Sequence, residues 1–418
     1  HSKECINFLN IVYNIVIYIY LIGVAIASCF NKKVKKMWAG ERQALKVLRE
    51  KVDPNARYIW FHAASLGEFE QGRPLMEYLR KTHPEYKILL TFFSPSGYEV
   101  RKNYEGADII CYLPLDTIRN ARRFLRSIKP VMAFFIKYEF WYNYLHILQH
   151  RGVPTYSVSS IFRPDQIFFQ WYGKGYGRVL KCFTHFFVQN IESKNLLAKL
   201  DIHDVEVVGD TRFDRVLQIK EASKQLPIVE KFTENISKVF IAGSSWLPDE
   251  EVFLKYFNLH KDWKLIVAPH VIGENHLAQI FELLKGRRVV RYTEATEENV
   301  KDAEVLIIDC FGLLSSIYHY GTISYVGGGF GVGIHNVLEA AVWDIPVIFG
   351  PNNKRFQEAQ GLIMAGGGFE INDYQSFRDL MMRFETDEMF LQTSKKHAGE
   401  FVKGRAGATE KIMGSLPL

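Results

Sequence analysis

Short apolar runs alternate with amphipathic stretches along most of this 418-residue chain, and the alternation occurs twice. Besides a strand that opens the stretch 58–68, the runs expected as strands in the first half are 87–93, 109–113, 131–135, 154–158, 184–188 and 205–208, with helical stretches between them such as 118–128, 141–150 and 191–200. Those expected in the second half are 239–242, 264–268, 288–291, 305–308, 322–326 and 346–349. This rhythm predicts parallel sheets with helices on both faces, so we expect an α/β protein.

Two domains are expected, because a chain of this length exceeds what one ordinary core holds. A hydrophobic content of 48% and a charged content of 23% are those of a folded protein. The polar segment 221–238 indicates a linker. We therefore expect an N-terminal segment with its basic flank over 1–36, a first domain over 37–220 and a second domain over 239–418. The last helix is allowed to cross back to the first domain.

The segment 6–30 contains no charged residue and is long enough to cross a hydrocarbon core of about 30 Å. Four lysines follow it at once: Lys32, Lys33, Lys35 and Lys36. By the positive-inside rule, that flank and the globular body lie in the cytoplasm, so we expect a membrane-anchor helix.

Two alternatives to a spanning anchor remain. The tyrosines Tyr13, Tyr18 and Tyr20 would equally suit a helix that lies at the membrane interface. The tetrapeptide 26–29 resembles a lipoprotein cleavage box, which would make the run a secretory signal. The basic cluster after the run, with only Lys3 before it, argues against export.

The net charge, the cysteine pattern and the glycine motifs limit which partners and cofactors we expect this chain to bind. A formal charge of +6 suggests phosphates or a membrane surface as partners rather than nucleic acid. The five cysteines are scattered without a C-x-x-C pair, so neither a zinc site nor a disulfide framework is indicated. Neither half has a G-x-G-x-x-G after its first strand, so a dinucleotide cofactor is not supported. We expect no cofactor and no metal.

The stretch 58–68 is the strongest candidate site of the first half. It has the pattern of a buried strand that runs through a small-residue turn, with Ser65 and Gly67, and delivers Glu68 to a helix start. In open α/β sheets, ligands bind at the carboxyl ends of strands. A catalytic carboxylate is one interpretation, and an acid that only complements the helix dipole is the other.

A glycine-rich loop follows the strand expected near 322–326 in the second half. Its glycines, Gly327, Gly328 and Gly333 among them, would let a ligand approach the backbone, and a helix start with free N–H groups would bind phosphate. Beyond the loop lie His335, Asn336 and Glu339, of which Glu339 could accept hydrogen bonds from ribose hydroxyls. A plain glycine turn followed by a solvated acid is the alternative.

Two further strand ends of the second half carry polar groups. Ser244 and Ser245 follow Gly243 and could contact a nucleotide phosphate, although a capped helix start explains them equally well. His270 ends the next strand, and Gly312 is a further candidate on the same side.

Together these segments resemble the 3-deoxy-D-manno-octulosonic acid (Kdo) transferase family. The segment 62–68 is similar to its H-S-x-S-x-G-E, 137–143 to E-x-E-x-W-P-N, 209–214 to G-x-x-K-F-D, 326–341 to V-G-G…G-H-N-x-L-E-A-A, and 38–42 to W-G-E-R. The resemblance runs in order to about Phe356 and implies the GT-B fold, in which two Rossmann-like domains face a central cleft.

The chain departs from the family pattern at several positions: Lys137 replaces an acid, Arg212 a lysine, Trp246 a histidine and Ile334 a glycine, and the arginine before His270 is absent. Arg212 keeps the charge but has a different hydrogen-bonding shape. None of these departures falls on Glu68.

The resemblance implies an inverting, metal-independent glycosyltransferase of lipopolysaccharide synthesis, which moves Kdo from CMP-Kdo to the lipid A precursor lipid IVA. Glu68 would be the general base. The implied acceptor-side residues are Ser65, Gly67, Glu139 and Arg212. The implied donor-side residues are Gly243, Ser244, Ser245, His270, Gly312, Gly327, Gly328, Gly333, His335, Asn336 and Glu339.

The implied partners are CMP-Kdo, the lipid A precursor and phospholipid of the inner membrane, with the globular body on the cytoplasmic face. Basic residues would favour anionic lipid: Lys32 to Lys36, and Arg119, Arg122, Arg123 and Arg126. A nucleotide-sugar epimerase or hydrolase is an alternative, which predicts turnover without an acceptor. A non-catalytic nucleotide-sugar-binding membrane protein is another, which predicts that Glu68 is dispensable.

Overall fold

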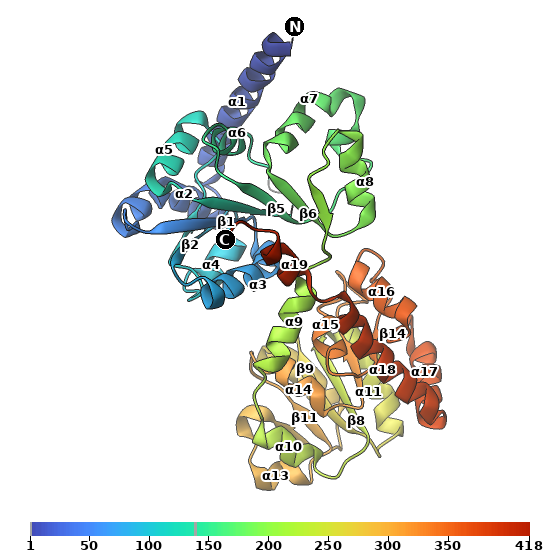
Figure 1. Ribbon diagram of the computed structural model, residues 1–418. Coiled ribbons are helices and arrows are strands. Elements are labelled where there is room, and N and C mark those ends of the chain that lie inside the picture. The colour runs from blue at the N-terminus through green and yellow to red at the C-terminus, as the bar shows by residue number, and fades with distance from the viewer. Residues whose placement is uncertain (1, 138–139) are drawn as a thin grey trace. The chain divides into compact units, whose positions relative to one another are not determined.

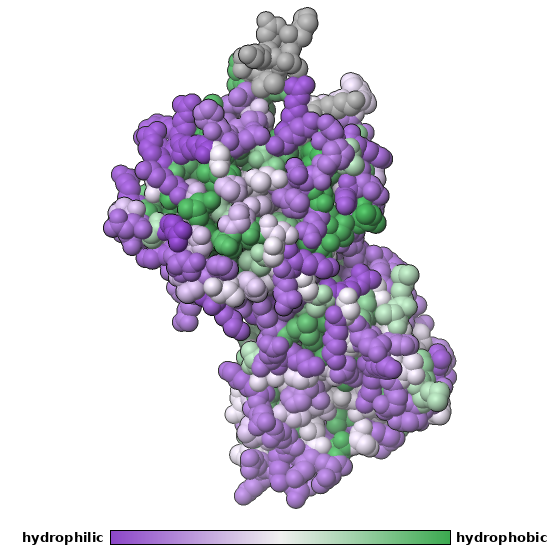
Figure 2. Space-filling view, in the orientation of Figure 1, coloured by the Kyte–Doolittle hydropathy of each residue, from purple (hydrophilic) through white to green (hydrophobic). Residues whose placement is uncertain are grey.

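The computed structural model describes residues 2–137 and 140–418 and divides into two compact units. The first unit comprises His1–Arg215 and Gly407–Leu418, and the second comprises Val216–Ala406. Each unit is built around its own sheet (Figure 1). Hydrophilic residues cover most of the face shown in Figure 2, so the apolar side chains lie mainly inside each unit.

Seven parallel strands form the sheet of the first unit, in the order β3-β2-β1-β4-β5-β6-β7. They are β1 (Arg57–Ala63), β2 (Tyr86–Phe92), β3 (Ile109–Tyr112), β4 (Met132–Ile136), β5 (Thr155–Ser160), β6 (His185–Val188) and β7 (Val205–Val207). In the register of β1, Ile59 pairs with Ile88 of β2 and with Met132 of β4.

Helices cover both faces of this sheet, because alternate strand residues point to opposite sides. Trp60 enters the core on one face and Phe61 the core on the other. The helices are α1 (Ser2–Ala27), α2 (Lys32–Lys51), α3 (Leu66–Thr82), α4 (Pro95–Arg101), α5 (Ile118–Ile128), α6 (Tyr142–His150), α7 (Lys174–Gly177), α8 (Ile191–Lys199) and α19 (Ala408–Gly414). Short 3-10 turns are η1 (Ile167–Phe169), η2 (Trp171–Gly173) and η3 (Arg178–Cys182).

Helix α1 is the N-terminal apolar segment. Among the described residues, it is the one helix long and apolar enough to cross a membrane, over Phe8–Ala27 with a mean hydropathy of 2.1. Only 6% of that window is buried. The outward-facing side chains include Ile15, Ile19 and Ile22, which fits association with a membrane.

The second unit has seven parallel strands in the order β10-β11-β9-β8-β12-β13-β14. They are β8 (Val239–Ser245), β9 (Lys264–Pro269), β10 (Val289–Arg291), β11 (Val305–Ile307), β12 (Ile323–Val326), β13 (Val347–Phe349) and β14 (Gly368–Glu370). The helices are α10 (Pro227–Thr233), α11 (Leu247–Leu259), α12 (Glu274–Leu283), α13 (Glu297–Lys301), α14 (Leu314–Ile317), α15 (Leu338–Ala341), α16 (Gln357–Ala365), α17 (Tyr374–Thr386) and α18 (Glu388–Arg405), with turns η4 (Tyr292–Glu294) and η5 (Tyr318–Tyr320).

The segment 221–238 differs from the expected linker. It contains α10, whose Val229 and Phe232 are buried, because α10 packs against α13 of the second unit. The boundary between the units falls instead inside α9 (Arg212–Glu221), after Arg215. The segment was expected to be a linker because it is mostly polar. The two buried apolar residues of α10 are too few to give a clear helical pattern.

The chain returns to the first unit at its end. Helix α19 packs on α3, and its Ala408 and Ile412 are buried in the same core as Phe61 (Figure 1). The carboxylate of Asp214 accepts hydrogen bonds from the backbone N–H of Gly407 at 2.7 Å and of Thr409 at 2.9 Å. Asp214 therefore fastens the start of α19 to the first unit.

Each sheet has a point where the strand order reverses. In the first unit this point lies between β1 and β4, and in the second between β8 and β12. In open α/β sheets, ligands bind outside the carboxyl ends of the strands at such a point. Most of the expected site segments follow these four strands, whereas Arg212, His270 and Gly312 come after β7, β9 and β11.

Candidate functional site

Glu68 lies in the first turn of α3, directly after β1. The turn between them contains Ser65, whose extended backbone begins the helix. The Ser65 hydroxyl donates a hydrogen bond to Oε2 of Glu68. Glu68 is half-buried, so its carboxylate is fixed by a neighbour and still reaches solvent. A carboxylate held in this way can accept a proton from a ligand.

Gly67 leaves open space beside Glu68. A Cβ added there would meet no protein atom within 4 Å, so packing inside the unit does not require a glycine. The residue is exposed. Its lack of a side chain leaves room for a ligand to approach the backbone of the turn.

Residues at the ends of β1 and β4 lie next to this turn. The buried His62 of β1 lies 2.7 Å from the Thr91 hydroxyl, and its ring contacts Trp141 with centroids 5.1 Å apart. Lys137 follows β4 with a left-handed φ of 64° and donates its N–H to the carbonyl of Val158. Glu139, expected on the acceptor side, lies outside the described residues.

Arg212 lies beside helix α3, because its neighbour Thr211 bonds to that helix. Its guanidinium pairs with Asp210 through Nε and a terminal nitrogen, both at 2.8 Å. The neighbouring Thr211 is buried and donates to the carbonyl of Gln71 at 2.5 Å, one turn beyond Glu68 on α3. The motif that contains Arg212 is therefore packed on the Glu68 helix, and Arg212 remains more than one-third exposed, at 38%.

The glycine-rich loop of the second unit is held by a buried carboxylate. Asp249 of α11 accepts hydrogen bonds from the Tyr325 hydroxyl at 2.6 Å and from the backbone N–H groups of Gly328 at 3.1 Å and Trp246 at 2.9 Å. Gly328 has a left-handed φ of 97°. A Cβ at Gly327 would collide with the carbonyl oxygen of Ser244, so the loop and the end of β8 touch backbone to backbone.

Three aromatic rings stack at the ends of β8, β9 and the loop. Trp246 lies against His270 with centroids 4.8 Å apart, and His270 against His335 at 4.1 Å. Burial lowers the pKa of His270, and burial together with His270 lowers the pKa of His335. Both imidazoles are therefore neutral at neutral pH, yet His270 is exposed and His335 half-buried, so an arriving anion can contact them.

A small cavity adjoins this stack. It has a volume of about 190 Å³ and is lined by Trp246, Pro248, Asp249 and the loop residues Gly328, Phe330, Gly331 and Val332. Trp246, which stands where the family has histidine, thus forms both the stack and a wall of the cavity.

Some of the expected donor-side residues are occupied inside the unit. The Ser245 hydroxyl is fully buried and donates to Glu250 at 2.7 Å, so it does not face a ligand. Gly243 is required by packing, because a Cβ there would collide with the Tyr318 hydroxyl. Ser244 stays half-buried with a left-handed φ of 51°. The carboxylate of Glu250 is buried and therefore needs a hydrogen-bond donor. The Ser245 hydroxyl is that donor, which explains why Ser245 turns inward.

The helix start after the loop also differs from expectation. Helix α15 has one turn, and Oδ1 of Asn336 accepts from the N–H of Leu338 at 2.9 Å and of Glu339 at 3.4 Å. These N–H groups are therefore already satisfied, so the helix start does not offer them to a phosphate. Asn336 has the role of a cap.

The remaining candidates occupy separate places. Burial raises the pKa of the Tyr318 hydroxyl, and the negative charge of the half-buried Glu339 nearby raises it further. Gly333 is buried in the loop with a φ of 134°, and its N–H donates to Gly328. Gly312 is exposed after β11 with open space around its Cα.

Sequence reasoning missed the role of Asp249. Trp246 and Asp249 form the spacing of a helix N-terminus in which the third residue binds back to the cap, and that spacing was readable as a capping acid. Its hydrogen bonds with Tyr325 and Gly328 could not be predicted from the sequence, because these partners lie 76 and 79 residues away along the chain. Among the described residues, no group of three or more His, Cys, Asp or Glu is placed to hold a metal ion.

Two Rossmann-like units, each with a parallel sheet whose strand order reverses once, define the GT-B class of fold. The UDP-GlcNAc 2-epimerase from Neisseria meningitidis bound to UDP-GlcNAc shares the fold with a TM-score of 0.60 at 14% identity, covering 85% of this chain and 98% of that one. A glycosyltransferase from Rickettsia africae does so at 0.55 and 12% identity, covering 86% and 97%.

Sequence relatives make the assignment narrower. The sequence model described as 3-Deoxy-D-manno-octulosonic-acid transferase (kdotransferase) matches residues 38–215. The 3-deoxy-D-manno-octulosonic acid transferase of Aquifex aeolicus is 30% identical over 323 residues, which cover 75% of this chain and 82% of that protein. The enzyme of the same name from Haemophilus influenzae is 27% identical over 385 residues, 87% of each. The chain belongs to the Kdo transferase family of glycosyltransferases.

Proposed function

We propose that this protein transfers Kdo from CMP-Kdo to a lipid A precursor, with lipid IVA as the acceptor and inversion at the anomeric carbon. The observation that carries the proposal is the placement of Glu68 at the reversal point of the first sheet, where the Ser65 hydroxyl fixes its carboxylate. Membership of the Kdo transferase family supplies the transferred sugar.

Glu68 is the general base of the proposed reaction. Its carboxylate takes the proton of an acceptor hydroxyl while that oxygen forms a bond to the anomeric carbon of Kdo. The bond from this carbon to the phosphate oxygen breaks, and CMP leaves with the electron pair. One displacement inverts the carbon. General-base assistance of this kind contributes about 10²–10⁴-fold.

The remaining acceptor-side groups orient the substrate. Arg212 presents a guanidinium beside the same helix and is suited to a phosphate or carboxylate of the acceptor. Ser65 aligns the base, and Gly67 leaves room for the sugar. Glu139 is kept as an acceptor-side residue on the family motif alone.

The second unit is proposed to bind CMP-Kdo at the glycine-rich loop. His270 and His335 would supply N–H groups to the phosphate, and these donors would stabilise the charge that develops on CMP. Ser244, Gly327, Gly328 and Gly333 let the backbone approach the nucleotide, and Glu339 is the ribose acceptor. Ser245, Gly243 and Asn336 support this site through packing and capping rather than by touching the donor.

Helix α1 is proposed to hold the enzyme on the inner membrane with its body on the cytoplasmic face. The acceptor is a lipid that stays in the bilayer, so an enzyme fixed at that surface meets it without extraction. Lys32, Lys35 and Lys36 directly follow the apolar helix and favour anionic lipid.

The test is incubation of the purified full chain with CMP-Kdo and lipid IVA, with mass spectrometry of the lipid. We expect a gain of one or more Kdo units, and a rate about 10²–10⁴-fold lower in Glu68→Ala. Glu70→Ala is the matched control, since Glu70 lies on the same helix and pairs with Arg101. CMP release without a lipid product would contradict transfer, and full activity in Glu68→Ala would remove the base.

A further inference from the structure

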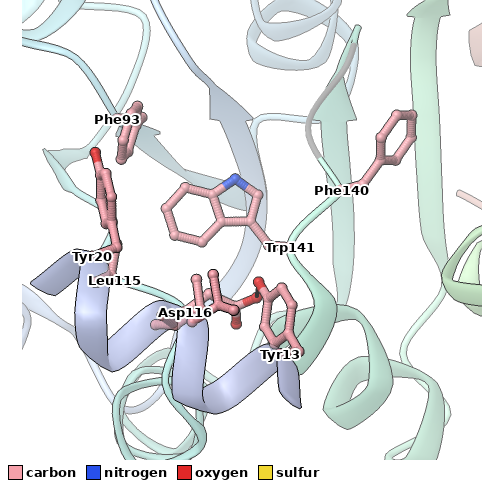
Figure 3. Close-up of a pocket in the computed structure, with 9 residues that line it drawn as sticks. Tyr13, Tyr20, Phe93, Leu115, Asp116, Phe140 and Trp141 are labelled. Carbon is pink, nitrogen blue, oxygen red and sulfur yellow. Dashed lines mark hydrogen bonds between the residues drawn. The ribbon is translucent and has the colours of Figure 1, made fainter. Parts of the chain in front are cut away.

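A pocket of about 420 Å³ lies between α1 and the carboxyl ends of the first sheet (Figure 3). Four residues of α1 line one side: Tyr13, Val16, Ile17 and Tyr20. The other side is formed by residues that follow β2, β3 and β4: Phe93, Leu115, Asp116, Phe140 and Trp141. Its volume lies within the range of ligand sites, about 300–1,000 Å³.

The lining is mostly apolar, and its polar groups include the carboxylate of Asp116 and the hydroxyls of Tyr13 and Tyr20. Asp116 is the one described lining residue with a formal charge, and its carboxylate accepts from the Tyr13 hydroxyl at 2.5 Å and from the N–H of Asn143 at 3.1 Å. Burial raises the pKa of Asp116 to about 6. A hydrocarbon chain in this pocket would therefore leave no buried charge without a partner.

The pocket adjoins the turn that carries Glu68. The N–H of Phe93 donates to the carbonyl of Ala64 at 3.3 Å, and Ala64 immediately precedes Ser65. Trp141, which stands in the middle of the pocket in Figure 3, contacts His62 at the end of β1. A molecule held in the pocket would thus begin close to the proposed base.

Helix α1 lines the pocket with one face and is exposed on the other. Tyr13 binds Asp116, and Asn14 accepts from Nδ2 of Asn143 at 2.9 Å, so polar bonds hold one face of α1 on the unit. Ile15 and Ile19, on the outer face, are 53% and 64% exposed. With α1 at the membrane, as proposed above, lipid chains would lie beside this helix and the pocket that it lines.

Basic side chains follow the pocket residues Leu115 and Asp116 along the chain. Helix α5 begins two residues after Asp116 and carries four exposed arginines: Arg119, Arg122, Arg123 and Arg126. An apolar pocket next to such a row is complementary to an amphiphile with hydrocarbon chains and anionic groups.

From this arrangement we infer that the pocket binds an acyl chain of the acceptor lipid, so that α1 forms a wall of the substrate site as well as a membrane attachment. The inference rests on the proposed function, which makes the acceptor a lipid. It extends that function by assigning lipid selectivity to named residues of α1. The chain is gripped beside the turn, and its headgroup sugar is directed to Glu68.

Val16→Trp tests this by filling the pocket, and Val12→Trp is its control. Both changes are identical and lie one turn apart on α1, but Val12 is not a lining residue. With lipid IVA as acceptor, we expect Val16→Trp to raise KM roughly tenfold, the loss of about two buried methylene groups. With the deacylated disaccharide bisphosphate, which has the same headgroup, neither variant changes KM.

An equal effect of the two tryptophans, or an equal rise in KM for the deacylated acceptor, overturns the inference. If the unaltered protein makes product and Val16→Trp keeps the normal KM, the inference is wrong while the proposed function stands. Absence of product from the unaltered protein is a failure of the proposed function instead.

Photolabelling tests the pocket without relying on turnover or on a variant that folds. Lipid IVA with a diazirine near the end of one acyl chain is bound to the full chain in vesicles of phosphatidylethanolamine and phosphatidylglycerol, and the label is mapped by mass spectrometry. We expect label on residues 13–20 and 140–141, removed by excess unlabelled lipid IVA. Label elsewhere, or equal competition by added phosphatidylglycerol, overturns the inference.

Discussion

The indole Nε1 of Trp246 donates a hydrogen bond to Nε2 of His335 over 3.0 Å. The acceptor nitrogen must carry a lone pair, so the proton of the neutral imidazole is on Nδ1. Trp246 stands where the Kdo transferase family has histidine, and its ring also stacks on His270. The replacement thus fixes the tautomer of a residue that we propose contacts the donor.

Trp246→Phe is expected to raise the pKa of His335, because the lost bond stabilises the neutral imidazole only. A titration of the histidine side chains by ¹⁵N NMR measures this directly. Trp171→Phe is the control, since Trp171 is 83% exposed. An unchanged His335 titration would show that burial and His270 alone set its pKa.

The same lowered pKa gives the second unit a pH dependence. The unfolded chain binds a proton first as the pH falls, so stability is lost from about pH 6.5, the ordinary histidine value, down through the lower folded pKa. Thermal unfolding from pH 7.5 to 5 should show this loss, and it should be smaller in Trp246→Phe. A loss of equal size in both proteins would assign it to other groups.

Asp249→Ala is expected to destabilise the second unit by about 3–5 kcal/mol, because the Tyr325 hydroxyl and two backbone N–H groups lose their acceptor. Denaturant unfolding measures the change. Glu251→Ala on the same helix is exposed and should stay within about 0.5 kcal/mol of the unaltered protein. Similar effects of the two changes would mean that Asp249 does not hold the loop.

Asp214→Ala is expected to loosen the C-terminal helix, since Gly407 and Thr409 lose the acceptor at the start of α19. Loss of such a cap costs about 0.5–2 kcal/mol. Hydrogen exchange over 407–418 should accelerate, while exchange over β8 stays the same. Glu410→Ala, an exposed change in α19, should have little effect.

Glu41→Gln is expected to stabilise the protein above neutral pH. Burial raises the pKa of Glu41 to about 8, and its Oε1 has no hydrogen-bond partner among the described residues. The folded state therefore keeps a proton that the unfolded chain releases above about pH 4.3, and stability falls as the pH rises from there to 8.

The two proteins should agree near pH 5 and differ by roughly 3–5 kcal/mol at pH 8. Thermal unfolding in detergent micelles follows both. Glu50→Gln, an exposed change on the same helix α2, supplies the control. Parallel pH curves for the unaltered protein and Glu41→Gln would contradict a protonated Glu41.

Local patterns predicted most of the fold. The expected helix 118–128 coincides with α5, and every strand expected from an apolar run is present with its ends no more than three residues from those expected. Such runs are readable because burial on both faces of a sheet requires continuous apolar residues. β14 (Gly368–Glu370) was not expected, because it begins with the last glycine of the run 366–368 and contains one apolar side chain, Phe369.

By itself, the sequence determined the two α/β halves, the apolar α1 and the turn that brings Ser65 to Glu68, because each depends on residues close along the chain. Only the tertiary structure decided that Asn336 is a cap, that Ser245 faces inward, that Asp214 holds α19 and that Tyr13 binds Asp116, 103 residues away. Which distant groups pair is set by how helices and strands pack around a common core. That choice leaves no trace in the local periodicity of the chain.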